Sequence, residues 1–237
     1  MVKNIKNYIK YNMKGKIINS AIIVAGGTGS RINSSIPKQF ISINGKEILN
    51  YSVETFFKHP KINEVVIVSN SKWINHVKDN YSNCKVVKGG DSRQKSVING
   101  IIATSNETIN VLIHDGARPF ITNSIISKCL SVLKSAKGSA PIIELTESII
   151  KHTNNNSTFL ERESCRLVQT PQCFKKQFIL NILKNNIQGT DEVGLALRLF
   201  PDQLLKFIPG DINNFKITHD IDLQLAKEFI NSQHTHD

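Results

Sequence analysis

A glycine-rich segment near the start of the chain has the composition of a phosphate-binding turn. Residues 25–31 read Ala-Gly-Gly-Thr-Gly-Ser-Arg and follow an apolar, β-branched run. Glycines let a backbone approach a phosphate closely and point its amide groups at the anion. Arg31, and Lys38 after Pro37, add two cations to this turn. The spacing matches neither the Walker A motif nor the dinucleotide fingerprint, and a tight turn with exposed basic residues is the alternative interpretation.

A second turn could also bind an anion. Residues 89–93 read Gly-Gly-Asp-Ser-Arg, and Ser96 follows one helical turn later. A turn that leads into a helix N-terminus favours a phosphate or a ribose hydroxyl. Taken alone, a plain turn with Asp91 as the helix N-cap is the simpler explanation.

A third cluster, residues 114–119 (His-Asp-Gly-Ala-Arg-Pro), stands at the carboxyl end of the apolar run 110–114. Parallel sheets place their ligands at that edge. Asp115 is well placed there to hold Mg²⁺ through its carboxylate oxygens, and its alternative roles are a helix cap or a partner for Arg118. The apolar surroundings predict that His114 is structural rather than catalytic.

The rest of the sequence predicts a scaffold that brings these strand ends together. Apolar strands alternate with helices of 3.6-residue periodicity, which indicates an α/β fold with a mostly parallel sheet covered by helices on both faces. The expected strands are 17–25, 64–69, 85–87, 110–114 and 204–208, and the expected helices are 48–59, 71–80, 92–105, 123–136 (capped by Asn123 or Ser124), 175–185, 191–200 (capped by Thr190) and 221–231.

The alternation breaks after Gly138, where extended and β-branched segments indicate a hairpin arm. We expect a single domain at 17–237 with a β-arm at about 138–168. The polar, Lys-rich residues 1–16 are expected to form an N-terminal extension.

Composition narrows the class of protein. The 237 residues are 40% hydrophobic and 21% charged, as is ordinary for a soluble globular protein, and no apolar run is long enough to span a membrane. The net charge of +11 suits an anionic partner, but the lysines form no block, so nucleic-acid binding is not indicated. Four scattered cysteines predict reduced thiols rather than disulfides or a zinc site. The polar, Lys-rich start of the chain does not resemble an export signal, so the cytoplasm is the expected compartment.

Together these segments resemble the 2-C-methyl-D-erythritol 4-phosphate cytidylyltransferases. The similarity runs from about Asn19 to Ile230, and the pieces that carry it appear in the family's order: AGGTGSR with PKQF, GGDSRQKSV, HDGARPFI, ERESCRLVQTPQCF, GTDEV and NFKIT. The resemblance implies a Rossmann-like domain with a protruding β-arm that interlocks two subunits as a homodimer. It also implies transfer of CMP from CTP to a polyol phosphate, 2-C-methyl-D-erythritol 4-phosphate, with Mg²⁺ as cofactor and release of pyrophosphate, in isoprenoid precursor synthesis.

The resemblance further implies roles for individual residues of this chain. Three cations would surround the reacting phosphates and carry catalysis: Arg31, Lys38 and Lys216. The nucleotide would be bound by Ala25, Gly26, Gly27, Gly29, Gly90, Asp91, Ser96 and Gly116. Asp115 would bind Mg²⁺. The polyol phosphate would be held by Arg118, Ser148, Arg162 and Thr190, with the arm supplied in part by the neighbouring subunit.

The arm departs from the family's usual pattern. Where the family often has Pro-Val-x-Asp-Thr, residues 144–148 read Glu-Leu-Thr-Glu-Ser, so Ser148 keeps only the final hydroxyl. Glu144 and the segment SKWINHVKD resemble the related D-ribitol 5-phosphate cytidylyltransferases, which make CDP-ribitol for wall or capsule polymers. That acceptor is therefore the alternative. A nucleotidyltransferase that uses UTP or another base, and a non-catalytic nucleotide-binding module, are further alternatives.

Overall fold

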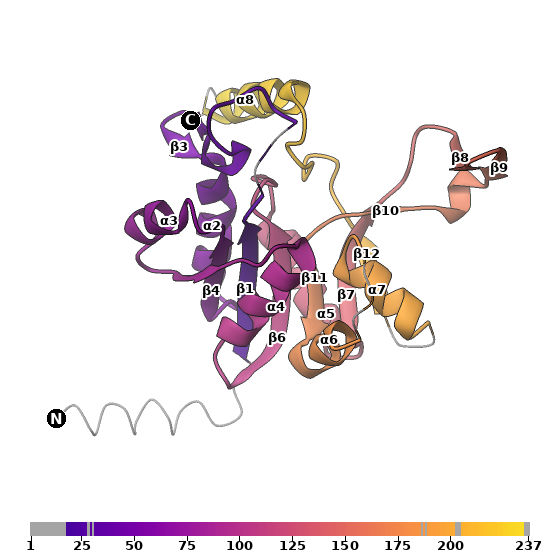
Figure 1. Ribbon diagram of the computed structural model, residues 1–237, viewed down its shortest axis with the longest axis horizontal. Helices are drawn as coiled ribbons and strands as arrows, with labels where there is room; N and C mark the ends of the chain where they lie inside the picture. The colour runs from indigo at the N-terminus through magenta and orange to yellow at the C-terminus, as the bar shows by residue number, and fades with distance from the viewer. Residues whose placement is uncertain are drawn as a thin grey trace.

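One sheet forms the centre of the molecule in the computed structural model (Figure 1). The structure describes residues 18–27, 29, 31–185, 187, 189–201 and 205–234, so the expected N-terminal extension, 1–16, lies outside the described residues. Seven strands lie in the order β10 (Leu167–Val168), β7 (Gly138–Ile143), β11 (Gln172–Lys175), β6 (Thr108–Asp115), β1 (Ile18–Ala25), β4 (Glu64–Ser69) and β5 (Lys85–Lys88), and β12 (Leu205–Pro209) also pairs with β7.

The strands that precede the predicted clusters, β1, β5 and β6, are parallel, and β4 lies between β1 and β5. β1 pairs in parallel with β4 on one side and with β6 on the other, and β4 pairs in parallel with β5. β11 and β10 run against this direction, since β11 lies antiparallel between β6 and β7 and β10 is antiparallel to β7. The carboxyl ends of β1 and β6 therefore meet at one edge of the sheet, where parallel sheets place ligands.

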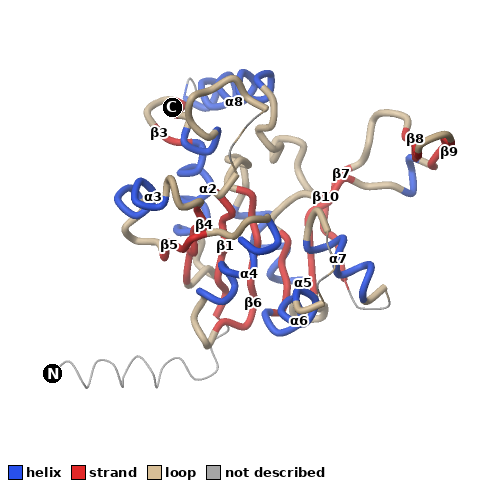
Figure 2. The backbone as a smooth tube through the Cα atoms, in the orientation of Figure 1, coloured by secondary structure: helices blue, strands red, loops and turns tan. Residues whose placement is uncertain are grey.

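Helices cover both faces of the sheet, as the alternation of elements predicted (Figure 2). Along β1, Ala21 and Ile23 face one apolar core and Ile22 faces the other, because neighbouring side chains of a strand point to opposite faces. The first core is closed by α2 (Ile48–Lys58), α3 (Ile74–Asn80) and α5 (Asn123–Val132), and the second by α4 (Arg93–Ala103), α6 (Lys176–Leu183) and α7 (Glu192–Leu199). The expected α/β class is confirmed.

The last helix, α8 (Asp220–His234), fixes a segment that the site needs. Ala226 and Ile230 of α8 pack with Ile48 and Ile217 in a third apolar cluster, beside the small hairpin β2 (Ser42–Ile43) and β3 (Lys46–Glu47). The backbone N–H of Ile217 also donates to Ala117 O at 2.9 Å. These contacts hold the chain before α8 against the loop that follows β6.

The arm is shorter than expected at its beginning. Residues 138–143 form β7, and its first four residues are buried in the sheet, so the segment that leaves the sheet starts after Ile143. Beyond it, β8 (Ile149–Thr153) and β9 (Asn156–Leu160) form an antiparallel hairpin, followed by the short 3-10 helix η2 (Arg162–Ser164). Figure 1 shows this hairpin projecting well away from the sheet.

Three helix caps lie one or two residues from the expected ones. The capping side chain accepts a hydrogen bond from the N–H three residues on, at 3.1, 3.3 and 2.6 Å respectively for α4, α5 and α7. A cap needs an extended backbone, and the path of the incoming loop decides which of several adjacent polar residues adopts it. The caps are Ser92, Thr122 and Asp191, rather than Asp91, Asn123 or Ser124, and Thr190. No helix in the described part of the chain has the length and apolar character that a membrane span requires.

Candidate active site

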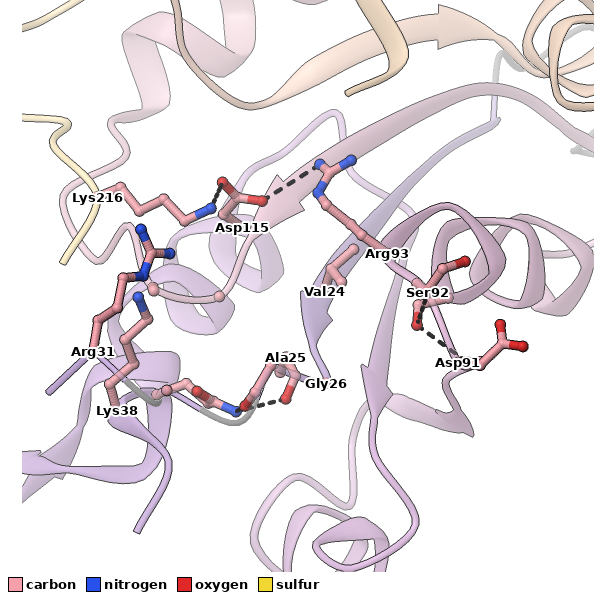
Figure 3. Close-up of a pocket in the computed structure, with 17 residues that line it drawn as sticks. Val24, Ala25, Gly26, Arg31, Lys38, Asp91, Ser92, Arg93, Asp115 and Lys216 are labelled. Atoms are coloured by element: carbon pink, nitrogen blue, oxygen red, sulfur yellow. Dashed lines mark hydrogen bonds and ion pairs between the residues drawn. The ribbon is translucent and has the colours of Figure 1, made fainter. Parts of the chain in front are cut away.

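A cavity of about 430 Å³ lies at the carboxyl ends of β1 and β6, beside the first turn of α4 (Figure 3). It joins the three clusters that stand apart in the sequence. Every residue expected to bind the nucleotide or the metal, or to act in catalysis, lines this cavity: Ala25, Gly26, Gly27, Gly29, Arg31, Lys38, Gly90, Asp91, Ser96, Asp115, Gly116 and Lys216. The fold thus brings together residues as far apart as Ala25 and Lys216.

The glycine turn fits closely against the segment that carries Lys38. Gly29 has a positive φ of +73°, which L side chains rarely adopt. A Cβ at Gly29 would also lie 3.0 Å from the backbone nitrogen of Lys38, closer than ordinary contact. The turn can therefore approach Lys38 only because residue 29 is glycine.

Three cations gather on one side of the cavity. Lys38 begins the 3-10 helix η1 (Lys38–Phe40) and is almost fully buried, whereas Arg31 is exposed. Burial lowers the pKa of Lys38, and the charges of Lys216 and Arg31 lower it further, to about 8. Because these cations repel one another, a bound polyanion would relieve the repulsion and favour the charged form of Lys38.

Asp115 is the acidic centre of the cavity, and its carboxylate contacts two different cations at one oxygen. Lys216 Nζ lies 2.9 Å and Arg118 Nε 3.7 Å from Oδ2, while an Arg93 nitrogen lies 3.4 Å from Oδ1. Burial alone would raise the pKa of Asp115, but the charges of Lys216, Arg93 and Arg118 outweigh it and hold that pKa well below its usual range. Asp115 is therefore ionised whenever the protein is folded near neutral pH.

Arg93 and Glu192 form an ion pair that the sequence alone did not reveal. Arg93 Nη1 donates to both carboxylate oxygens of Glu192, at 2.7 and 2.9 Å, and the Glu192 side chain is 1% exposed. Gln172 Oε1 accepts the backbone N–H of Glu192 at 3.0 Å and so fixes the start of α7. The sequence did contain a signal for the importance of both residues. Arg93 lies in GGDSR and Glu192 in GTDEV, two of the segments that carry the family resemblance.

The second turn is held in place by Ser96. The N–H of Gly90 donates to Ser96 Oγ at 3.1 Å, and Ser96 Oγ donates to Ser92 O at 2.9 Å. Gly90, Asp91 and Ser92 all line the cavity. The turn thus presents polar backbone to the cavity on the side opposite the cations, as Figure 3 shows for Asp91 and Lys38.

His114 has the structural role that the sequence predicted. Its Nε2 lies 3.0 Å from the carbonyl oxygen of Arg118, which can only accept, so Nε2 donates and Nδ1 accepts from the Thr170 hydroxyl at 3.0 Å. Burial lowers the pKa of His114 to about 4. The imidazole is therefore neutral near pH 7 and ties β6 to the loop before β11.

The four residues expected to hold the acceptor do not share one site within the chain. Arg118 lies next to Asp115, and its Nη1 donates to Asn214 O at 2.8 Å. Thr190 is exposed just before α7, whereas Ser148 and Arg162 are exposed on the arm. None of these four residues lines the central cavity, and Arg118 contacts Asp115, which does.

The arm carries a second, open cavity of about 390 Å³. Arg162 Nη1 donates to Thr146 O at 2.8 Å across it, and Arg166 lies 3.9 Å from the Glu144 carboxylate. Both arginines thus belong to a polar surface of the arm rather than to the central cavity.

The central cavity can take a metal ion only together with other ligands. Among the described residues, no three His, Cys, Asp or Glu side chains are grouped closely enough to hold a metal by themselves. Asp115 supplies one ionised carboxylate, whose side chain is 12% exposed. Mg²⁺ commonly binds through one or two carboxylates, substrate phosphates and water. The residues present therefore fit an ion that arrives with a triphosphate.

Comparison with known proteins identifies a family. The sequence model of 2-C-methyl-D-erythritol 4-phosphate cytidylyltransferase matches residues 19–232. The chain is 37% identical over 225 residues to the protein of that name from Clostridium novyi, covering 90% of this chain and 96% of the relative. It is 39% identical over 236 residues to the one from Neorickettsia sennetsu, covering 93% and 99%.

Solved structures give the same result. A 4-diphosphocytidyl-2C-methyl-D-erythritol synthase from Anaerococcus prevotii superposes with a TM-score of 0.82 at 25% identity, covering 93% of this chain and 99% of that one. The 2-C-methyl-D-erythritol 4-phosphate cytidylyltransferase of Francisella tularensis superposes with a TM-score of 0.74 at 27% identity, covering 88% and 98%.

Proposed function

Because the chain belongs to the 2-C-methyl-D-erythritol 4-phosphate cytidylyltransferase family, we propose that its central cavity transfers CMP from CTP to 2-C-methyl-D-erythritol 4-phosphate and releases pyrophosphate. The observation that carries this proposal is the convergence of the glycine turn, Asp115 and the three cations on one cavity. The reaction is a step of isoprenoid precursor synthesis.

The chemistry suits the residue types. A phosphate oxygen of the acceptor attacks the α-phosphorus of CTP, a new P–O bond forms, and the bond to the pyrophosphate oxygen breaks. The nucleophile is already an anion, so no general base is required. The protein's task is to hold two anions together and to stabilise the charge that grows on the transferred phosphoryl group.

We assign that stabilisation to the three cations Arg31, Lys38 and Lys216. Lys216 and Arg31 both lower the pKa of Lys38, which means that the three positive charges lie close enough to act on one another. Their charges are thus concentrated where phosphates would meet. Gly26, Gly27 and Gly29 are assigned to the triphosphate, and Gly90, Asp91, Ser96, Ala25 and Gly116 to the rest of the nucleotide.

We propose Mg²⁺ as the cofactor, with Asp115 as its protein ligand. When bound, the ion would neutralise part of the phosphate charge and polarise the group under attack. The support is an ionised carboxylate inside a cavity lined by cations. The test is to titrate Mg²⁺ into the wild type and Asp115→Asn: the variant should need at least about tenfold more Mg²⁺ for half-maximal rate. An unchanged Mg²⁺ requirement would remove Asp115 from this role.

We propose that the arm completes the acceptor site of a second subunit in a homodimer. Ser148 and Arg162 lie on the arm, apart from the cavity of their own chain, and the hairpin presents an apolar pair, Ile150 and Phe159, that are 59% and 60% exposed. A second copy that covered this pair would also bring Arg162 toward the neighbouring cavity, where Arg118 and Thr190 would share the acceptor.

An acceptor panel tests the proposed function directly. Pyrophosphate release from CTP is measured with 2-C-methyl-D-erythritol 4-phosphate, with D-ribitol 5-phosphate and with no acceptor, and then with UTP in place of CTP. We expect release only when 2-C-methyl-D-erythritol 4-phosphate and CTP are both present. Release only with ribitol 5-phosphate, or only with UTP, would replace the assigned substrate, and no release under any condition would leave a nucleotide-binding module.

We propose the cytoplasm as the compartment, since the four cysteines carry free thiols.

A further inference from the structure

The glycine turn after β1 is held by two side-chain amides that come from other segments. Gln39 Nε2, on η1, donates to Ala25 O at 2.7 Å and to Gly27 O at 2.8 Å. Asn70 Nδ2, directly after β4, donates to Gly26 O at 3.3 Å. Three successive carbonyl groups of the turn are therefore engaged from outside the turn.

These bonds restrict how the peptide groups of the turn can point. The carbonyl and the N–H of one peptide unit lie on opposite sides of a rigid plane, so fixing the carbonyl also fixes the N–H. The carbonyls of Ala25 and Gly26 belong to the peptide units that carry the N–H groups of Gly26 and Gly27. The amides of Gln39 and Asn70 thus occupy the carbonyl oxygens of this turn, which a phosphate would repel.

We propose that Gln39 is a positioning residue for the triphosphate: its amide holds the carbonyl oxygens of Ala25 and Gly27 away from the anion and so leaves the N–H group of Gly26 for it. This inference rests on the proposed function, because it takes the bound anion to be the phosphates of CTP. Asn70 supports the same arrangement at a third carbonyl through a longer bond.

The surroundings of Gln39 separate this role from a purely structural one. Its side chain is buried, and the neighbouring Phe40 anchors η1 independently by stacking on Trp73, with ring centroids 4.9 Å apart. Lys38, on the other side, lines the cavity. Loss of the Gln39 amide should thus disturb the turn while Phe40 still holds η1, so triphosphate binding should weaken more than turnover.

The main test replaces Gln39 by methionine, which keeps the length of the side chain and loses its donors. The affinity for pyrophosphate, measured by calorimetry, should fall by at least about tenfold and the KM for CTP should rise by as much, since the carbonyls of Ala25 and Gly27 lose their partner. The KM for the polyol phosphate and the kcat at saturating CTP should stay within about twofold. Wild-type pyrophosphate affinity in Gln39→Met would overturn the inference.

Asn110 offers a matched control at the opposite end of the sheet. It is 3% exposed, like Gln39, and its Nδ2 donates to Asn19 Oδ1 at 2.7 Å near the start of β6. Asn110→Leu should lower the melting temperature and leave pyrophosphate affinity unchanged. Equal losses of affinity in Asn110→Leu and Gln39→Met would show a general effect of destabilisation and refute the positioning role.

Asn70→Ser extends the test to the third carbonyl. Serine keeps an oxygen that can accept from Trp73 N–H, as Asn70 Oδ1 does at 3.1 Å, but it loses the amide donor. Its loss of pyrophosphate affinity should be smaller than that of Gln39→Met. If Gln39→Met does not fold, Asn70→Ser decides alone, and an unchanged affinity there overturns the inference. If the wild type binds pyrophosphate but turns over no CTP with any acceptor, the proposed function is wrong, whatever the role of Gln39.

Discussion

The acidic centre of the cavity, Asp115, is nearly buried among its ion-pair partners, whereas the ion pairs of the arm face solvent. Asp115 contacts three cations, and its side chain is only 12% exposed. Glu163, on the arm, is paired with Arg162 at 3.3 Å, but its side chain is 73% exposed. Water screens the second pair far more strongly than the first.

The apolar side chains of the two regions also differ in burial: those beneath the cavity are buried, and those of the arm hairpin are exposed. The cavity stands on strands whose side chains fill two cores, whereas β8 and β9 pair with each other in a separate two-stranded sheet. An isolated hairpin is marginal in water, and this one exposes Ile150 opposite Phe159. The geometry of the cavity is thus determined by one chain. We propose that a second subunit fixes the position of the arm.

The largest effect should come from the cavity, at Lys38. Lys38→Ala removes a buried cation from the place where phosphate charge grows, so kcat should fall by about a thousandfold. The KM for CTP should change less, because the turn and the other cations remain. Steady-state kinetics measures both, with the exposed Lys128→Ala as control. Near-normal turnover in Lys38→Ala would remove Lys38 from catalysis.

A second comparison sets the buried ion pair of the cavity against the exposed pair of the arm. Glu192→Gln keeps the size of the side chain but leaves Arg93 without the carboxylate that accepts from its Nη1, so the free energy of unfolding should fall by about 3 kcal/mol. Glu163→Gln on the arm should leave it unchanged within error. Urea unfolding followed by circular dichroism measures both variants. Equal stabilities of the two would abolish the distinction between the regions.

The third prediction concerns the arm. Arg162→Ala should raise the KM for the polyol phosphate by about tenfold, because a charged hydrogen bond to the acceptor is lost, and should leave the KM for CTP unchanged. Kinetics with each substrate varied in turn measures this difference. A raised KM for CTP would place Arg162 at the nucleotide instead.

Mixing two impaired variants tells which cavity an arm serves. At an acceptor concentration well below its KM, co-refolded Lys38→Ala and Arg162→Ala should reach about a quarter of wild-type activity, since half of the dimers are mixed and each mixed dimer has one intact site. That result requires each arm to reach the other subunit's cavity. If an arm serves its own chain, every site in the mixture carries one of the two defects, and the activity stays at the average of the separate variants.

The cavity could be foreseen from the sequence to a greater extent than the arm. The glycine turn, Asp91 and Asp115 each follow a predicted strand, and parallel strands end at one edge, so their convergence follows from the alternation of elements alone. Lys216 is placed by contacts of the segment before α8, and only the family resemblance indicated it.

What the sequence could not give depends on contacts between distant segments. Arg93 and Glu192 are 99 residues apart, and Glu192 stands beside a second acid, Asp191, from which the sequence does not distinguish it. In the structure they differ completely: Asp191 caps α7, and Glu192 is buried against Arg93. Residues 138–143 read as part of the arm because a β-branched segment looks the same inside a sheet and in a hairpin.

The smallest effect should be a dependence on pH that belongs to the cavity alone. Lys38 has a pKa of about 8, lowered by burial and by the charges of Lys216 and Arg31. If its charge is needed, kcat/KM should be halved near pH 8 and fall further above it, while kcat holds to higher pH because bound phosphates favour the charged form. Lys38→Arg stays charged in this pH range, so its kcat/KM should not fall above pH 8. A fall that persists in Lys38→Arg would be caused by the titration of another group. Folding gives the opposite sign: between the folded pKa of about 8 and the ordinary value of 10.5 the unfolded chain binds more protons, so this residue makes stability rise with pH just where activity declines.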